Sequence, residues 1–316
     1  MHIIYLDQFA TSGMFDSTGI PEWEEIRSLL HTGVTMNKII CPMSVEHYLE
    51  TSQKDSARAA HLDTEFYKLS MGYAFKAEPF ITSQLMISAV RKNNITIRTF
   101  LHDKIKKGIL EDEGNYQALH RQKIEFNMKA AEATVVAHHI RKIARHKKVD
   151  SKVGQSILAA SRFITLSHFL ERLNALLVHG HIIIRPVSFP SGDIPNWIDS
   201  IIYQLTNRHR MTKKELKTLI SHLRKFEFTR IPTLDIRTSL SGLIAVNNKN
   251  ENPNDQIDIG RIATGLALSD ILLTDSQRKS EIQELGLDSK YRTKVFSGKK
   301  KDLEQLIGEL KSIVAM

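Results

Sequence analysis

The chain has 316 residues, of which 41% are hydrophobic and 25% charged, the balance of a globular protein with a sizeable core. Its one cysteine, Cys41, excludes an intrachain disulfide and favours a reducing compartment. No run approaches the roughly 18 apolar residues of a membrane span, and the start MHIIYLD lacks a signal-peptide pattern, so we expect a cytoplasmic protein with no membrane partner. The net charge of +9 favours an anionic partner such as nucleic acid; a scatter of Lys and Arg over helix surfaces is the alternative.

The first elements alternate between strand and helix. HIIYL, residues 2–6, predicts a buried strand that ends at Asp7, and 38–41 predicts a second strand. Between them, 21–33 begins with Pro and ends with Gly, as helices do. Another helix is expected from Ser44, whose hydroxyl can cap it. This order predicts βαβ units and a parallel sheet.

The middle of the chain changes to long helical periodicity with almost no Pro or Gly. The pattern predicts helices over 114–148 and 150–180, the second with Asp150 as N-cap and Gly180 as C-cap. The apolar run HIIIRPV, 181–187, predicts a buried strand.

The last third predicts helices and then strands again. Thr212 and Glu215 have the spacing of a capping box. The remaining predicted elements are helices at 197–207 and 234–246, a loop at 247–256, a helix from Asp258, strands at 271–274 and 294–297, and a final helix from Lys301.

These elements predict an α/β fold in which a parallel sheet is flanked by helices and carries a large helical insertion. We expect the sheet domain to comprise residues 1–54 and 180–316, and the insertion to comprise residues 55–179.

Four acids are expected at one edge of this sheet, where the carboxyl ends of parallel strands meet and ligands bind. Asp7 ends the first predicted strand, and Glu50 lies about two turns into the helix after the second. Asp258 opens a predicted helix, and the strand after that helix returns to the same edge and ends at Asp275. Asp270 precedes this strand, so we expect it at the opposite edge.

A cluster of carboxylates needs compensating charge, because like charges repel. Mg²⁺ or Mn²⁺ supplies this positive charge and takes the carboxylate oxygens as ligands. Such a site activates water for in-line attack on phosphorus. Each acid also has a structural alternative. Asp7, Asp258 and Asp275 can cap helices, whereas Glu50 can be a solvated helix residue, with Glu46 as a rival for its role.

The order of these residues resembles the PIN-domain nucleases, at the start and the end of the chain. In that family an Asp directly follows strand one, as in IIYLD, and a Ser stands shortly before a helical Glu, as Ser44 stands before Glu50. Its last motif is an Asp followed by a strand that ends in Thr and Asp, as in DIGRIATGLALSDILLTD at 258–275.

By this resemblance Asp7, Glu50, Asp258 and Asp275 take the metal-binding positions. Two departures stand out. More chain separates Glu50 from Asp258 than in a compact PIN domain, and no residue separates Thr274 from Asp275.

The resemblance implies a metal-dependent endoribonuclease that uses Mg²⁺ or Mn²⁺ and leaves a 5′-phosphate. Analogy with small bacterial members suggests a toxin or defence effector with a regulatory protein partner. Two alternatives stay open: a DNA nuclease with the same site, and a non-catalytic PIN-fold adaptor that binds nucleic acid.

Two further groups of side chains invite a functional interpretation. Histidines at 138–139 and 179–181 lack the spacing of metal ligands, because adjacent residues on a helix do not face one another. Basic clusters at 141–148, 208–217 and 299–301 are either phosphate-binding tracks or solvated faces, and the few aromatic residues among them give little support for base stacking.

Overall fold

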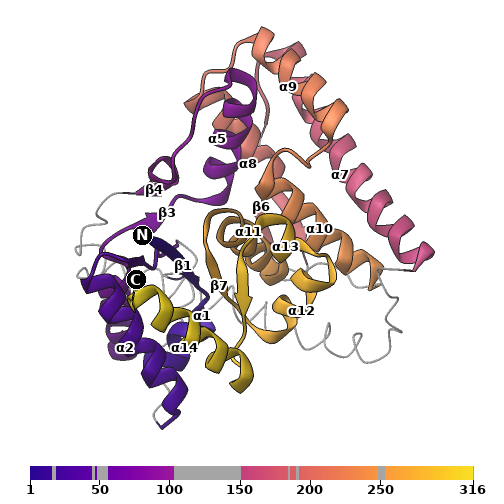
Figure 1. Cartoon of the computed structure of the whole chain (residues 1–316). Helices are drawn as coiled ribbons and strands as arrows, with labels where there is room; N and C mark the ends of the chain where they lie inside the picture. Colours follow the sequence, from indigo (N-terminus) through magenta and orange to yellow (C-terminus); the bar gives the residue numbers. More distant parts are fainter. Residues whose placement is uncertain are drawn as a thin grey trace. The chain divides into compact units, whose positions relative to one another are not determined.

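The computed structural model describes residues 1–15, 19–44, 47, 56–102, 151–183, 186–189, 192–247 and 253–315. Over these residues the chain is mostly helical and contains a small parallel sheet of four strands, consistent with an α/β fold (Figure 1). Internal contacts divide the chain into two compact units. The first unit is Met1–Lys76, Phe100–Glu125 and Gly265–Met316, and the second is Ala77–Thr99 and Phe126–Thr264. The domain boundaries predicted after residues 54 and 179 stay a prediction.

The sheet lies in the first unit and has the order β2-β1-β7-β8, with every neighbouring pair parallel. Its strands are β1 (His2–Leu6), β2 (Ile39–Ile40), β7 (Ile271–Leu273) and β8 (Lys294–Phe296). The four strands predicted at these places are confirmed. The β1 and β7 side chains are almost all buried and apolar, as expected when both faces of a parallel sheet are covered.

Helices of the first unit cover the sheet, and two of them, α2 and α14, run side by side (Figure 1). The helices are α1 (Gln8–Phe15), α2 (Pro21–Thr35), α4 (Ser56–Ser70), α12 (Ser276–Glu284), α13 (Leu287–Tyr291) and α14 (Lys300–Ala315). The helices predicted over 21–33 and from Lys301 are confirmed. Short strands β3 (Ala74–Phe75) and β4 (Leu101–His102) form a separate antiparallel pair.

Helix α11 (Pro253–Leu268) begins earlier than predicted, so the prediction that Asp258 opens it is wrong. Pro253 starts the helix, where a missing N–H removes no intrahelical bond. Near its other end, Gly265 lies against the central strand. A Cβ placed there would be 2.7 Å from Tyr5 Cδ1, so only glycine lets the helix approach β1 this closely.

The second unit is a helical body whose core is formed by aliphatic and aromatic side chains such as Phe169, Leu219 and Phe228. Its helices include α5 (Glu78–Arg91), α7 (Lys152–His179), α8 (Trp197–Tyr203), α9 (Lys213–Phe226) and α10 (Pro232–Val246). It also contains the 3-10 turn η1 (Ile97–Phe100), which overlaps the unit boundary, and the π-helical turn η3 (Gln204–Arg208). The predicted helices at 150–180, 197–207 and 234–246 are confirmed, and so is the capping box of Thr212 and Glu215.

Two local predictions in this unit are wrong. The N-cap of α7 is Ser151, whose side chain accepts the Gly154 N–H, rather than Asp150; Gly180 is the C-cap, as predicted. The strand predicted over 181–187 is displaced, since 181–183 is not a strand and β5 (Pro186–Phe189) pairs with β6 (Gly192–Pro195). An apolar run becomes a strand only where a partner strand is available, and here the partner lies just downstream. The helices predicted from Ser44 and over 114–148 lie outside the described residues, except at Ser44 and His47.

A buried ion pair connects α5 and α10 in the second unit. The Arg237 guanidinium donates to both carboxylate oxygens of Glu78, at 2.7 and 2.5 Å, and its third nitrogen donates to Gln256 Oε1 at 2.8 Å. Both charged side chains are less than 10% exposed. A buried pair of this kind stabilises the fold only while both partners are present.

No helix in the described parts of the chain is long and apolar enough to cross a membrane.

Replacing Gly265 with Ala should destabilise the first unit by about 1–3 kcal/mol, because the new methyl group overlaps the Tyr5 ring. Gly308→Ala, at an exposed position of α14, is the matched control, since nothing lies within 4 Å of its Cβ position. It should stabilise by about 0.5–1 kcal/mol through helix propensity. Urea unfolding of both variants measures this; equal effects would contradict the close approach.

Arg237→Met should cost about 3–5 kcal/mol, because it leaves the Glu78 carboxylate buried without its partner. Adding Glu78→Leu should recover most of that loss, since no buried charge then remains. Chemical unfolding of both single variants and the double variant tests the coupling. Purely additive losses would show that the two side chains do not depend on one another.

Candidate functional site

Asp7 lies directly after β1, at the carboxyl edge of the sheet, and is half-buried. Its Oδ1 accepts the Gln8 N–H at 2.7 Å, and its Oδ2 accepts the Thr274 hydroxyl at 3.1 Å. Its backbone N–H continues the β1–β7 pairing by donating to Leu273 O. Asp7 therefore ends the strand and opens helix α1, as its place in the sequence predicts.

Asp275 lies at the end of the neighbouring strand β7. The register pairs Leu6 with Leu273, which puts Thr274 level with Asp7 and Asp275 one residue beyond. Asp275 is the N-cap of α12, because its Oδ1 accepts the Gln277 and Arg278 N–H groups at 2.7 and 3.0 Å. Asp7 and Asp275 thus stand at adjacent strand ends.

Thr274 is fully buried between these acids and bonds to both neighbouring strands. Its N–H donates to Phe296 O of β8 at 3.0 Å, and its hydroxyl donates to Asp7 on the other side. Because no residue separates Thr274 from Asp275, the threonine orients one acid while the next residue caps a helix.

A polar cluster that was not predicted anchors the end of β1. His47 is buried; its Nε2 lies 2.6 Å from Leu6 O and its Nδ1 lies 2.8 Å from Ser44 Oγ. Since Nδ1 also accepts the Ser44 N–H, the imidazole proton is on Nε2 and donates to Leu6 O. The Tyr5 hydroxyl completes the cluster at 3.0 Å from Ser44 Oγ. The spacing of Ser44 and His47 on a predicted helix was the available signal.

The other two predicted acids are placed differently. Asp258 belongs to the second unit, in the second turn of α11, where its Oδ1 accepts from Arg261. The Asp258 side chain is 30% exposed, whereas Arg261 is only 6% exposed. Glu50 and its rival Glu46 lie outside the described residues. The four-carboxylate cluster therefore stays a prediction.

Asp270 lies at the opposite edge of the sheet, as strand direction predicts. Its Oδ2 accepts the Ile3 N–H at 2.8 Å and lies 3.7 Å from His2 Nδ1. Its carboxylate is used to align the start of β1 with the start of β7.

The chemistry of Asp7 and Asp275 fits a hard divalent cation. Mg²⁺ is usually held by one or two carboxylates together with waters, and carboxylate oxygens also suit Mn²⁺. The described residues contain no group of three or more His, Cys, Asp or Glu arranged to hold a metal ion. The metal site therefore stays a prediction.

The remaining candidates divide into structural and undescribed residues. Cys41 is buried in the core, and burial raises the pKa of its thiol. His181 Nδ1 contacts the His179 carbonyl at 3.1 Å. The clusters at 138–139 and 141–148 lie outside the described residues.

Thr274→Val keeps the side-chain shape but removes the hydroxyl that donates a hydrogen bond to Asp7. It should lower the free energy of unfolding by about 1 kcal/mol. Thr293→Val is the matched control, because the Thr293 hydroxyl donates to Leu266 O and Ser269 O at the other edge. Both variants should lose stability in urea unfolding, but only the first should shift the carboxylate ¹³C resonance of Asp7. An unchanged resonance would show that Thr274 does not orient this acid.

Comparison of the chain with family models, with curated proteins and with solved structures finds no match. The assignment of function therefore depends on the residues at the carboxyl edge of the sheet and on the resemblance of their order to PIN-domain nucleases.

Proposed function

We propose that the protein is a metal-dependent endoribonuclease of PIN-like fold, with its catalytic centre at the carboxyl edge of the sheet. One observation carries the proposal: Asp7 and Asp275 end two adjacent parallel strands, β1 and β7. Ligands of open α/β sheets bind at this edge. The chain supplies there two of the four acids that the resemblance assigns to metal binding.

Asp7 and Asp275 would hold Mg²⁺ or Mn²⁺, and the proposed site also includes Glu50 and Asp258. When bound, the metal supplies a more acidic water and stabilises the charge that develops at phosphorus. The chain keeps the two described acids in place: the Thr274 hydroxyl orients Asp7, and the first amides of α12 orient Asp275. The Asp7 carboxylate is half-buried, so protein rather than bulk water forms part of its surroundings.

The proposed substrate is RNA, which agrees with the net charge of +9, since neutralising phosphates releases counterions. We place the activity in the cytoplasm, where a defence effector or toxin would meet RNA and a regulatory protein partner. DNA cleavage by the same site, and nucleic-acid binding without cleavage, are outcomes that the experiment below distinguishes.

Asp7→Asn and Asp275→Asn should each lower the rate of RNA cleavage in Mn²⁺ by more than roughly a hundredfold. Loss of a residue that only hydrogen-bonds to a metal ligand costs roughly 10- to 100-fold, and a direct ligand should cost more. Asparagine remains a good N-cap and hydrogen-bond acceptor, so circular dichroism and the unfolding midpoint should change little. Asp270→Asn is the matched control at the other edge of the sheet and should cleave like the wild type.

Labelled RNA and DNA of the same sequence, with Mg²⁺, Mn²⁺ or EDTA, measure the reaction. EDTA should abolish cleavage, and the RNA product should carry a 5′-phosphate. Cleavage that survives both edge substitutions, or that Asp270→Asn abolishes equally, would place the chemistry elsewhere. Binding without cleavage by the wild type would favour the adaptor.

A further inference from the structure

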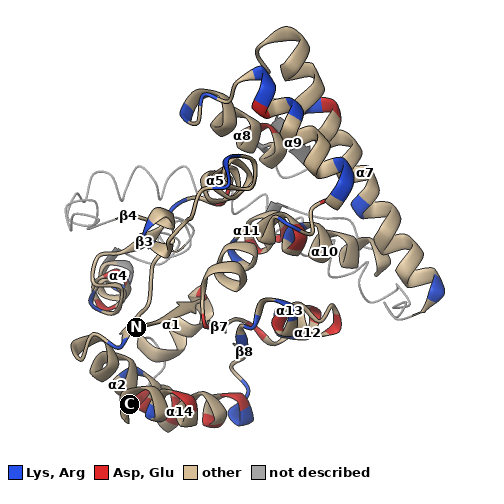
Figure 2. Ribbon diagram, turned by 45° about the horizontal axis from the view of Figure 1, so that its top comes forward, with Lys and Arg blue, Asp and Glu red and all other residues tan. Residues whose placement is uncertain are grey.

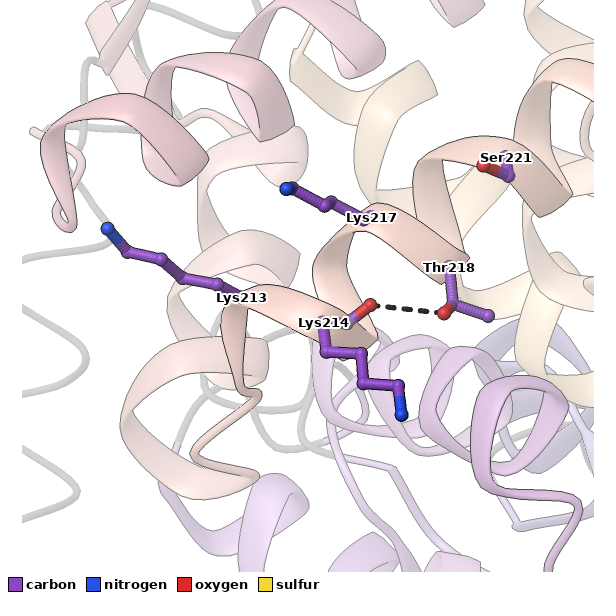
Figure 3. Close-up of a pocket in the computed structure, with 5 residues that line it drawn as sticks. All are labelled: Lys213, Lys214, Lys217, Thr218 and Ser221. Carbon is purple, nitrogen blue, oxygen red and sulfur yellow. Dashed lines mark hydrogen bonds between the residues drawn. The ribbon is translucent and has the colours of Figure 1, made fainter.

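Helix α9 of the second unit has one apolar side and one basic side. Its apolar side chains Leu216, Leu219, Ile220 and Leu223 are buried in the core. On the exposed side, five residues line a shallow depression open to solvent (Figure 3): Lys213, Lys214, Lys217, Thr218 and Ser221. We call these five residues the lysine face.

The positive charge of the lysine face is not neutralised within the described part of the chain. None of its three lysines forms an ion pair with a described residue. Further basic residues follow along α9 (Figure 2). Two lysines of the first unit differ, because Lys279 and Lys311 lie 2.8 and 2.7 Å from carboxylate oxygens. The lysine face therefore presents three unpaired ammonium groups, each with three donors.

The one acid of the first turn of α9 is held away from this face. Glu215 accepts from Thr212 in the capping box and from Arg91 of α5, whose Nε lies 2.6 Å from Glu215 Oε1. The bond from Arg91, followed by that from the Thr212 N–H, lowers the pKa of Glu215 to about 2, so the pair stays charged near neutral pH. With its apolar side in the core and Glu215 paired to Arg91 of α5, α9 exposes the side that carries Lys213, Lys214 and Lys217 to solvent.

We infer that the lysine face binds the sugar–phosphate backbone of a nucleic-acid strand. Lys213 and Lys217 extend to the same side (Figure 3), and their Cα atoms are separated by about 6 Å of helix rise. Phosphates on one strand of duplex DNA recur about every 3.4 Å of helix axis, so Lys213 and Lys217 can meet phosphates two nucleotides apart. The Thr218 hydroxyl donates to Lys214 O, which leaves the ammonium groups and Ser221 as donors. This inference takes the class of polyanion from the proposed function, whereas binding itself requires no cleavage.

Other ligand classes fit this surface less well. The lysine face has no aliphatic or aromatic residue, whereas the buried centres of protein interfaces are rich in aromatic side chains. A membrane-surface helix needs its apolar side towards lipid, and that of α9 is in the core. Small-molecule sites are lined mainly by hydrophobic side chains, unlike this depression. Nor do aromatic residues line it for base stacking, so the backbone is the expected contact.

The test is binding of a fluorescent RNA duplex by the full chain in EDTA, where cleavage cannot occur. The triple variant Lys213→Gln, Lys214→Gln, Lys217→Gln should bind roughly tenfold more weakly or worse at low salt. It should also reduce the slope of log Kd against log salt by about 2–3, since each phosphate contact contributes about 0.9. Glutamine keeps the helix propensity of lysine, so the fold should be retained.

The control variant Lys92→Gln, Lys152→Gln, Lys290→Gln removes the same charge from exposed lysines outside the basic clusters and should keep the slope of the wild type. Asp7→Asn should also bind like the wild type, so lost cleavage with retained binding separates this surface from the catalytic proposal. The inference would be overturned if the control variant weakened binding equally, or if the wild type bound no duplex. It would also be overturned if the lysine face bound polyglutamate more tightly than RNA.

Discussion

The parallel pairing of β1 with β7 is the contact on which the described site depends. It joins segments 267 residues apart, and its register sets Asp7 level with Thr274. Successive strand residues face opposite sides of a sheet, so a slip of one residue would turn every side chain to the wrong face. The apolar side chains of both strands fill the core, and burial there makes any other register costly. Packing that stabilises the sheet therefore also determines where the acids stand.

Hydrogen bonds from buried polar side chains complete this arrangement at the strand ends. Thr274 donates to one neighbouring strand through its hydroxyl and to the other through its amide, while His47 donates to the last carbonyl of β1. Burying such groups is unfavourable unless each finds a partner, and here the partners are strand ends or the acid itself. The same bonds that satisfy the buried groups hold Asp7 on a rigid scaffold, which a reactive or ligand-binding group requires.

The second unit pairs several of its arginines with acids. Three arginines are matched to buried acids, in the pairs Arg237–Glu78, Arg162–Asp235 and Arg172–Asp199, and Arg91 is matched to Glu215. Arginine suits such pairs because its planar donors bind carboxylates in fixed geometry. The first three of these acids are thereby withdrawn from the surface, whereas Lys213, Lys214 and Lys217 of α9 are exposed and form no ion pair with the described residues. A net positive charge thus becomes a localised basic face, which a sum over the composition cannot show.

The sequence by itself determined the elements whose signals are local. The order of strand and helix at the start of the chain follows from local periodicity and boundary residues. The capping box of Thr212 and Glu215 and Gly180 at the end of α7 depend on bonds between near neighbours, and strand direction alone separated Asp270 from Asp275. Only the tertiary structure decided that the Thr274 hydroxyl donates to Asp7 and that His47 donates to Leu6 O. It also decided that Glu215 pairs with Arg91, and which strand the apolar run near Pro186 joins. Each of these features depends on a second segment that the hydrophobic periodicity of the first cannot identify, because a hydrogen bond or a strand register belongs to two segments together.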